Sequence, residues 1–164
     1  MSAPLNQNNN YIVFSYLKSA LAKEECSKII SYFKDPKAGL FEDSGKFINN
    51  NETRKSEIVN LKYEESTKWI FDIISAHAFD CNSFNFKYEI AGIVEALQIA
   101  RYTEGGHYTW HQDIGSSLLS TRKLSLVIQL SGEEEYEGGD LEFLTSKDKA
   151  PKGQGDMIIF PSFN

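Results

Sequence analysis

Residues 102–113 read YTEGGHYTWHQD, in which a strand-like run over 107–113 follows a Gly-Gly turn and ends on His111 and Asp113. In a β-strand, side chains two residues apart point to the same face. His111 and Asp113 are therefore expected side by side, with Gln112 facing away. One imidazole and one carboxylate are two of the three ligands of the 2-His-1-carboxylate facial triad. The same spacing also fits a strand histidine that is hydrogen-bonded to a surface carboxylate.

The regions around this run predict two helices and a series of strands. A short strand is expected at 11–14, then a helix over 19–33 with Ser19 as its N-cap, and a second helix over 64–79. Residues 37–53 read as a loop with one edge strand. After Cys81, strands are expected at 84–88, 93–102, 107–113, 123–130, 139–144 and 156–160. Helices followed by antiparallel strands predict an α+β domain with a β-sandwich or jelly-roll core.

The length of 164 residues fits one domain. We expect a disordered tail over residues 1–10, which are polar and Asn-rich, and one domain over 11–164. Within that domain, 11–80 would supply the helical support and 84–164 the jelly-roll strands.

Charge and composition exclude several classes of function. The net charge is −6 and the pI is near 5.1, which argues against nucleic acid and anionic membranes as partners. No apolar run approaches the roughly 20 residues of a membrane-spanning helix, and no basic region leads into a signal sequence. Cys26 and Cys81 are expected to be reduced, buried thiols. These features predict a cytoplasmic protein.

Three spaced motifs together carry a resemblance to a known family. The first is Tyr-x-x-Gly-x-x-Tyr-x-x-His-x-Asp, from Tyr102 to Asp113. The others are YEGGDLEF at 136–143 and GDMIIFPSF at 155–163. In this order they resemble the iron(II)- and 2-oxoglutarate-dependent dioxygenases of the prolyl-4-hydroxylase type, in particular the PKHD-type hydroxylases. The resemblance covers most of the chain and is strongest from Ile93 to Phe163.

The resemblance implies a fold, a set of site residues and a reaction. The fold would be a double-stranded β-helix, or jelly roll, with the N-terminal helices packed on it. His111 and Asp113 match two iron ligands, Tyr102 matches a residue that holds 2-oxoglutarate, and Tyr108 lies at the substrate side. Tyr102 also fits a simple core tyrosine. The implied cofactors are Fe(II), 2-oxoglutarate and O2, with ascorbate as a further candidate. The implied reaction hydroxylates a prolyl-like or other amino-acid C–H bond, in a small molecule or a peptide, and releases succinate and CO2.

The chain departs from the family pattern at its end. The third ligand, a histidine, is expected beyond Asn164, so we expect a C-terminally truncated domain whose last strands are missing. His77 lies on a helix face, and His107 would be roughly 13 Å from His111 along one strand, so neither is a substitute. An alternative is a non-catalytic, degenerate jelly-roll binding module that lacks the third ligand. A metal-dependent hydrolase fits less well, because such zinc sites use more histidines.

Overall fold

The computed structural model describes residues 12–43 and 46–164. The tail expected over residues 1–10 lies outside the described residues. Two α-helices, α1 (Lys23–Ile30) and α2 (Lys68–Cys81), occur together with antiparallel strands. The strands in chain order are β1 (Ser15–Leu17), β2 (Lys37–Ala38), β3 (Phe41–Asp43), β4 (Lys46–Ile48), β5 (Arg54–Lys55), β6 (Glu57–Leu61), β7 (Leu97–Arg101), β8 (His107–Tyr108), β9 (Leu124–Ile128) and β10 (Met157–Pro161). This mixture is consistent with the predicted α+β class.

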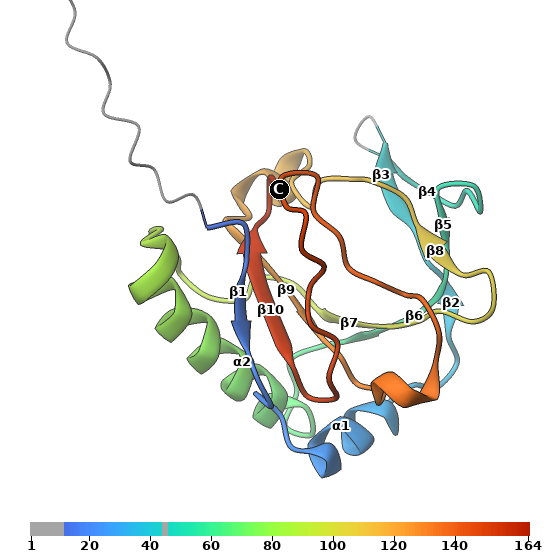
Figure 1. Cartoon of the computed structure of the whole chain (residues 1–164), viewed down its shortest axis with the longest axis horizontal. Helices are drawn as coiled ribbons and strands as arrows, with labels where there is room; N and C mark the ends of the chain where they lie inside the picture. The colour runs from blue at the N-terminus through green and yellow to red at the C-terminus, as the bar shows by residue number, and fades with distance from the viewer. Residues whose placement is uncertain (1–11, 44–45) are drawn as a thin grey trace, which may run out of the picture.

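The strands form two three-stranded sheets and two short ladders (Figure 1). One sheet has the order β1-β10-β9, so the C-terminal strand lies between the first strand and β9. The other has the order β2-β6-β7, and the ladders pair β3 with β4 and β5 with β8. All of these pairs are antiparallel. Strands far apart in sequence therefore pair, which places residues 15–17 beside residues 157–159.

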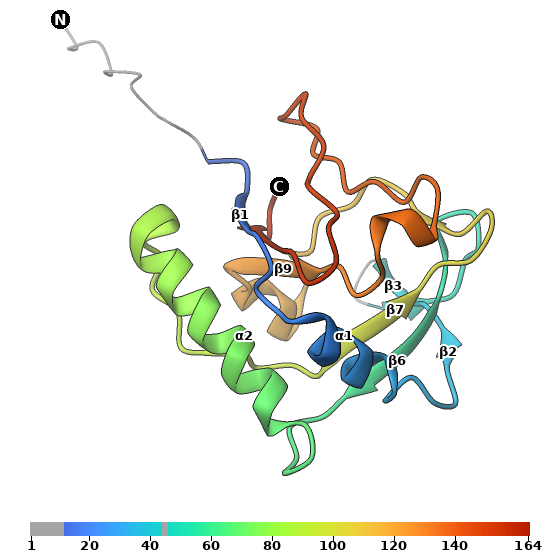
Figure 2. The ribbon, with the colours of Figure 1, turned by 60° about the horizontal axis from the view of Figure 1, so that its bottom comes forward.

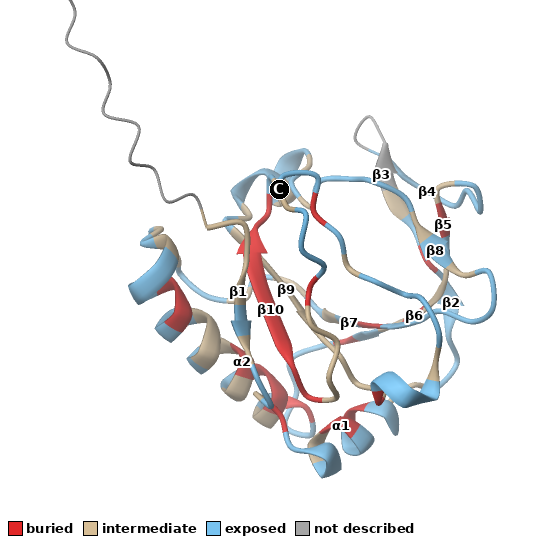
Figure 3. Cartoon of the chain, in the orientation of Figure 1, coloured by how far each residue is buried: buried red, intermediate tan, exposed pale blue. Residues whose placement is uncertain are grey.

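The main core lies between the helices and the two larger sheets. Figure 3 shows β10 buried along its length, and Met157, Ile158 and Ile159 are fully buried. Cys26 of α1 and Ile70 of α2 belong to the same buried cluster as Met157. Figure 2 shows α1 and α2 on the side of the molecule that carries β1. The helices therefore cover apolar side chains that a single strand layer would leave in water.

A smaller cluster covers the opposite face of β10. Ile158 and Phe160 pack there with Phe143 and Ala150. The Phe143 ring stacks on Phe14 with centroids 5.1 Å apart and meets Phe160 edge-to-face at 5.0 Å. Because adjacent residues of a strand point to opposite faces, β10 contributes to both clusters and so requires an almost entirely apolar sequence.

The N-terminal elements begin later than the sequence predicts. The first strand is Ser15–Leu17, not 11–14, and Tyr11 lies outside the described residues. Helix α1 starts at Lys23, because the Ala22 N–H donates to the Glu25 carboxylate at 2.7 Å. Ser19 is not its cap. Its backbone has φ of +50° and its N–H donates to the Asp156 carboxylate at 2.8 Å.

Two strand predictions after Cys81 are wrong. Helix α2 runs straight into a π-helical turn, η1 (Asn82–Phe86), where a strand is expected over 84–88. The Asn82 side chain donates to the Tyr88 carbonyl at 2.8 Å and accepts from the Tyr88 N–H at 3.0 Å, so a local side-chain bond closes this turn. Residues 139–144 form no strand, although Phe143 is buried as its alternating pattern requires.

Elsewhere the elements are shorter or more numerous than expected. The strands predicted over 93–102 and 107–113 are observed as the shorter β7 and β8. The strands predicted over 123–130 and 156–160 agree closely with β9 and β10. The predicted loop 37–53 contains β2, β3 and β4. Residues 15–81 therefore supply six strands as well as both α-helices. No helix within the described ranges is long and apolar enough to cross a bilayer.

The turn before β10 yields a stability prediction. Gly155 has φ of +82°, its carbonyl accepts from the Leu21 N–H at 3.0 Å, and a Cβ there would overlap the Leu21 carbonyl oxygen. Gly155→Ala is expected to lower the free energy of unfolding by about 2–3 kcal/mol, measured by urea denaturation. The matched control is Gly138→Ala, because Gly138 has φ of +70° but open space around its Cα. Its expected loss is about 1 kcal/mol. Equal losses in the two variants would contradict the overlap argument.

Candidate metal centre

His111 and Asp113 meet where the chain leaves β8. Their closest side-chain atoms, His111 Nε2 and Asp113 Oδ1, are 3.3 Å apart. Both side chains are about one-third exposed, at 34% and 29%. The segment after Tyr108 is not a regular strand, so the two side chains do not meet through simple strand alternation. The predicted neighbours are brought together, but by the local conformation of residues 109–113.

A hydrogen bond of the His111 ring determines which of its two nitrogens can bind a metal. His111 Nδ1 lies 2.7 Å from the Thr109 carbonyl oxygen. A carbonyl oxygen can only accept, so Nδ1 carries a proton and donates it. In the neutral imidazole, Nε2 then has a free lone pair directed at a carboxylate oxygen. Two electron-rich atoms at this distance require a cation between them, which is either a second imidazole proton or a metal ion.

The Asp113 carboxylate is kept ionised by its surroundings. Burial favours its neutral form, but hydrogen bonds from His111 and Ser125 and the positive charge of Arg122 outweigh burial and lower the pKa of Asp113 below its ordinary value. The Ser125 and Ser162 hydroxyls are 3.0 Å apart, and Ser162 is fully buried. A chain of hydroxyls thus leads from the end of β10 to the carboxylate.

The backbone around Asp113 is held by two partners. The Ser162 carbonyl accepts from the N–H groups of Asp113 at 2.9 Å and Ile114 at 3.1 Å. The Arg122 guanidinium donates to the Asp113 carbonyl at 2.7 Å and forms a two-pronged pair with Glu95. Hydrogen bonds to Ser162 at the end of β10, and to Arg122 of the Arg122–Glu95 ion pair, therefore hold the turn that carries the Asp113 carboxylate.

The pair fits a metal ion geometrically. Adjacent ligands on bonds of about 2.1 Å at a right angle are about 3.0 Å apart, close to the 3.3 Å found between Nε2 and Oδ1. One nitrogen and one oxygen donor suit Fe(II), Mn(II) or Zn(II). Across residues 12–43 and 46–164, no group of three or more His, Cys, Asp or Glu side chains is placed to hold a metal. The described residues thus offer two ligands, and the predicted third, beyond Asn164, stays a prediction.

The other two histidines lie elsewhere, as expected. The His107 ring is tied to two backbone carbonyls, those of Gly105 at 3.2 Å and Glu52 at 3.1 Å. His77 lies in α2 and is partly buried. Neither belongs to the His111–Asp113 pair.

The two predicted tyrosines have different environments. Tyr108 stacks on the His111 ring, with centroids 3.5 Å apart and an angle of 16°. Burial raises the pKa of Tyr108, against the opposing effect of Arg54, so its phenol is neutral at neutral pH. Tyr102 follows β7, is 44% exposed and lies near enough to Tyr108 to add to that pKa increase. The Tyr108 ring thus covers one face of the His111 imidazole, and the role of Tyr102 stays a prediction.

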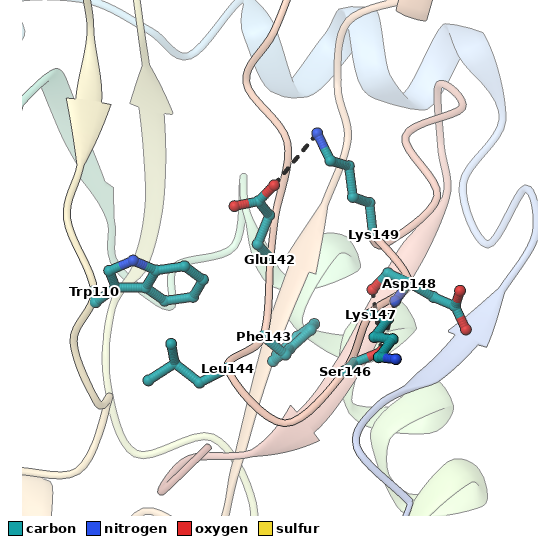
Figure 4. Close-up of a pocket in the computed structure, with 8 residues that line it drawn as sticks. All are labelled: Trp110, Glu142, Phe143, Leu144, Ser146, Lys147, Asp148 and Lys149. Atoms are coloured by element: carbon teal, nitrogen blue, oxygen red, sulfur yellow. Dashed lines mark hydrogen bonds and ion pairs between the residues drawn. The ribbon is translucent and has the colours of Figure 1, made fainter.

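A pocket that the sequence did not predict is lined in part by Trp110, the residue before His111. It has a volume of about 300 Å³, and in Figure 4 the Trp110 ring lies across from the segment that carries Glu142 and Leu144. Its lining consists of Trp110, Glu142, Phe143, Leu144, Ser146, Lys147, Asp148 and Lys149. Trp110 and Leu144 are 59% and 80% exposed, so an apolar surface adjoins the metal pair. The exposed Trp beside the His-x-Asp motif was the available signal.

Comparison with known proteins agrees with this geometry. Residues 97–164 match the family model of the 2OG-Fe(II) oxygenase superfamily. A PKHD-type hydroxylase of Prochlorococcus marinus (strain NATL2A) is 24% identical over 148 residues, which are 88% of this chain and 66% of that protein. A PKHD-type hydroxylase of Synechococcus sp. (strain CC9605) is 35% identical over 74 residues, 42% of this chain and 32% of that protein.

Two solved structures share the fold. A viral collagen prolyl hydroxylase of Paramecium Bursaria Chlorella virus-1, solved as a complex with 2OG, has a TM-score of 0.67 at 23% identity and covers 92% of this chain and 78% of its own. A Pseudomonas putida prolyl-4-hydroxylase has a TM-score of 0.64 at 14% identity. The match covers 93% of this chain and 82% of that protein's chain. Residues 97–164 of the chain thus resemble the 2OG-Fe(II) oxygenase superfamily, and the chain is similar to prolyl-4-hydroxylases and PKHD-type hydroxylases. This chain covers 66% and 32% of the two curated relatives.

The hydroxyl chain behind Asp113 yields a second prediction. Ser125→Ala would leave the buried Ser162 hydroxyl without this partner and remove a donor to Asp113. We expect the free energy of unfolding to fall by about 1–3 kcal/mol in urea denaturation. The control is Ser120→Ala, whose exposed hydroxyl donates to the Ser117 carbonyl and whose expected effect is below about 0.5 kcal/mol. A Ser125 variant as stable as the control would refute the structural role of the chain.

Proposed function

We propose that His111 and Asp113 bind Fe(II) in a 2-oxoglutarate-dependent oxygenase that hydroxylates a C–H bond of a prolyl-like or other amino-acid side chain. The observation that carries this proposal is that His111 Nε2 lies 3.3 Å from the ionised Asp113 carboxylate while Nδ1 is bonded to the Thr109 carbonyl. The match of residues 97–164 to the 2OG-Fe(II) oxygenase superfamily model supports the chemical context of the pair.

The roles of the residues follow from their positions. When bound, iron would supply the chemistry by which O2 gives one oxygen atom to succinate, formed from 2-oxoglutarate with loss of CO2, and the other to the substrate C–H bond. His111 is oriented for this by the Thr109 carbonyl, and Asp113 by Ser125 and the Ser162 backbone. Such outer contacts fix ligand direction and commonly matter for affinity nearly as much as the ligands.

Two further roles belong to this proposal. Tyr102, half-exposed near Tyr108, would donate its hydroxyl to 2-oxoglutarate, and Tyr108 would face the substrate. A neutral phenol can donate such a hydrogen bond to a carboxylate. Similarity to PKHD-type hydroxylases and prolyl hydroxylases supports an amino-acid substrate, peptidyl or free, and ascorbate is a candidate reductant.

A second candidate is a jelly-roll module that binds a partner without catalysis. The observation that favours it is that residues 12–43 and 46–164 provide two metal ligands and not three. Metal-dependent binding of 2-oxoglutarate separates the two candidates, because a degenerate site would bind 2-oxoglutarate equally with and without metal.

The metal assignment gives a direct prediction. Mn(II), used as an air-stable substitute for Fe(II), is expected to bind the protein with one site, measured by the electron paramagnetic resonance signal of free Mn(II). His111→Ala and Asp113→Ala are each expected to weaken binding by at least about 10-fold, because each removes a direct ligand. The control is His107→Ala, since His107 contacts backbone carbonyls instead. Absence of binding, or binding that both ligand variants retain, would contradict the assignment.

The role of Tyr102 gives a separate prediction. Tyr102→Phe is expected to weaken Mn(II)-dependent binding of 2-oxoglutarate by about 5-fold, the effect of one lost hydrogen bond, while Mn(II) affinity stays unchanged. Isothermal titration calorimetry with and without Mn(II) measures both. Tyr63→Phe is the control, because Tyr63 is an exposed tyrosine that packs on Phe71. Unaltered binding in the Tyr102 variant would assign this residue to the fold alone. Formation of succinate with Fe(II), lost in Asp113→Ala, tests catalysis itself.

A further inference from the structure

Behind the metal pair lies a buried arginine whose described partners are all neutral. Arg54 of β5 is only 7% exposed. Its guanidinium donates to the Leu40 carbonyl at 2.8 Å, to the Ser56 hydroxyl at 3.0 Å and to the Gln98 amide oxygen at 2.5 Å. Three donors in fixed directions hold the plane of this group rigidly.

The backbone beside Arg54 is shaped to admit this arrangement. Gly39 donates its N–H to the Ser56 carbonyl at 2.8 Å, and a Cβ at Gly39 would overlap the Ser56 hydroxyl and lie 2.7 Å from Arg54 Nε. Only glycine leaves room for both side chains at this point. The position of the guanidinium therefore depends on three segments, 39–40, 54–56 and 98.

A column of stacked groups connects Arg54 to the metal ligand. The Arg54 Cζ lies 4.6 Å from the centroid of the Tyr108 ring, and that ring stacks on the imidazole of His111 at 3.5 Å. A guanidinium over an aromatic face is held by the negative charge of the ring face. The Tyr108 ring is thereby enclosed between a fixed cation on one side and the imidazole of the ligand.

The backbone runs parallel to this column. Arg54 and Tyr108 are paired in the β5–β8 ladder, and the Thr109 N–H donates to the Thr53 carbonyl at 2.9 Å. The carbonyl of the same Thr109 accepts from His111 Nδ1. The stacked side chains fix the tilt of the imidazole, and the Thr109 carbonyl fixes its rotation. Together they determine where Nε2 points.

We infer that Arg54 is a positioning residue of the metal centre: through the Tyr108 ring it holds the His111 imidazole with Nε2 directed toward Asp113. Its importance for metal binding rests on the function proposed above, whereas its effect on the imidazole does not. A planar guanidinium is required, because a lysine ammonium can keep the charge but cannot bond Leu40, Ser56 and Gln98 at once.

The first measurement is made on the metal-free protein. The chain has three histidines, so the imidazole C–H signals of His77, His107 and His111 can be resolved by NMR and assigned by single substitution. Ring stacking is expected to shift the His111 signals upfield. In Arg54→Lys and in Arg54→Met these signals should move toward the position of an unstacked histidine, as in Tyr108→Leu, while those of His77 stay unchanged.

The second measurement is Mn(II) affinity, which is expected to fall about 10-fold in Arg54→Lys. Gly39→Ala displaces Arg54 without removing it and should produce the same two effects. If Arg54→Met fails to fold, the Gly39→Ala variant tests whether the position of Arg54 controls the His111 signals and the Mn(II) affinity. The matched control is Arg101→Lys, because Arg101 also lies over an aromatic ring, Phe33 at 4.8 Å, but that ring is not the one stacked on His111 and its ion-pair partner is Glu57. Neither measurement should change in that variant.

The outcomes are separable. If the wild type binds no Mn(II), the proposed function fails, and the NMR signals still decide whether Arg54 positions His111. If folded Arg54→Lys and Gly39→Ala proteins melt at lower temperature but keep the wild-type His111 signals, Arg54 is merely structural and the inference is overturned. Wild-type Mn(II) affinity in both variants would also overturn it.

Discussion

Strand β10 is the element on which both the core and the candidate site depend. It is buried on both faces, pairs with β1 on one side and β9 on the other, and contributes to both apolar clusters. At its end, the Ser162 carbonyl accepts from the backbone of Asp113 and Ile114. Displacement of β10 would therefore disturb the packing of the domain and the position of a metal ligand together.

The site itself is defined by an electrostatic requirement. A carboxylate kept ionised by His111, Ser125 and Arg122 faces Nε2 of an imidazole whose Nδ1 is bonded to the Thr109 carbonyl. A partly buried carboxylate with a shifted pKa beside an imidazole is a candidate binding centre. The neighbouring groups are correspondingly fixed. Glu95 anchors Arg122, and Gly39 makes room for Arg54.

Similarity to known proteins and the local geometry support the functional proposal in different ways. Residues 97–164 match the model of the 2OG-Fe(II) oxygenase superfamily, and the two structural neighbours, at 14% and 23% identity, show a shared fold. Neither identifies the donor atoms in this chain. The proposal for the donor atoms rests on the Nε2–Oδ1 separation and the bond to Thr109, because ligand chemistry depends on which atoms face each other.

The sequence by itself determined the chemical content of the site and much of the core. His111, Asp113 and Tyr108 come from a motif whose residue types and spacing are visible without a structure, and the apolar runs at 123–130 and 156–160 predict β9 and β10 well. Short-range patterns suffice there because a strand buried on both faces needs a continuous apolar sequence. Where local polar bonds compete with pattern, as at Ser19 and Asn82, the prediction was wrong.

Only the tertiary structure decided how the site is supported. Arg54 lies 57 positions before His111, and Glu95 and Ser162 come from opposite sides of the motif, so no local pattern relates them to the metal pair. Their roles arise from the antiparallel pairing of β5 with β8 and from the end of β10, both long-range contacts. The sequence determines the ligands because ligand chemistry belongs to the side chains. Their direction depends on contacts that exist only once distant segments have packed together.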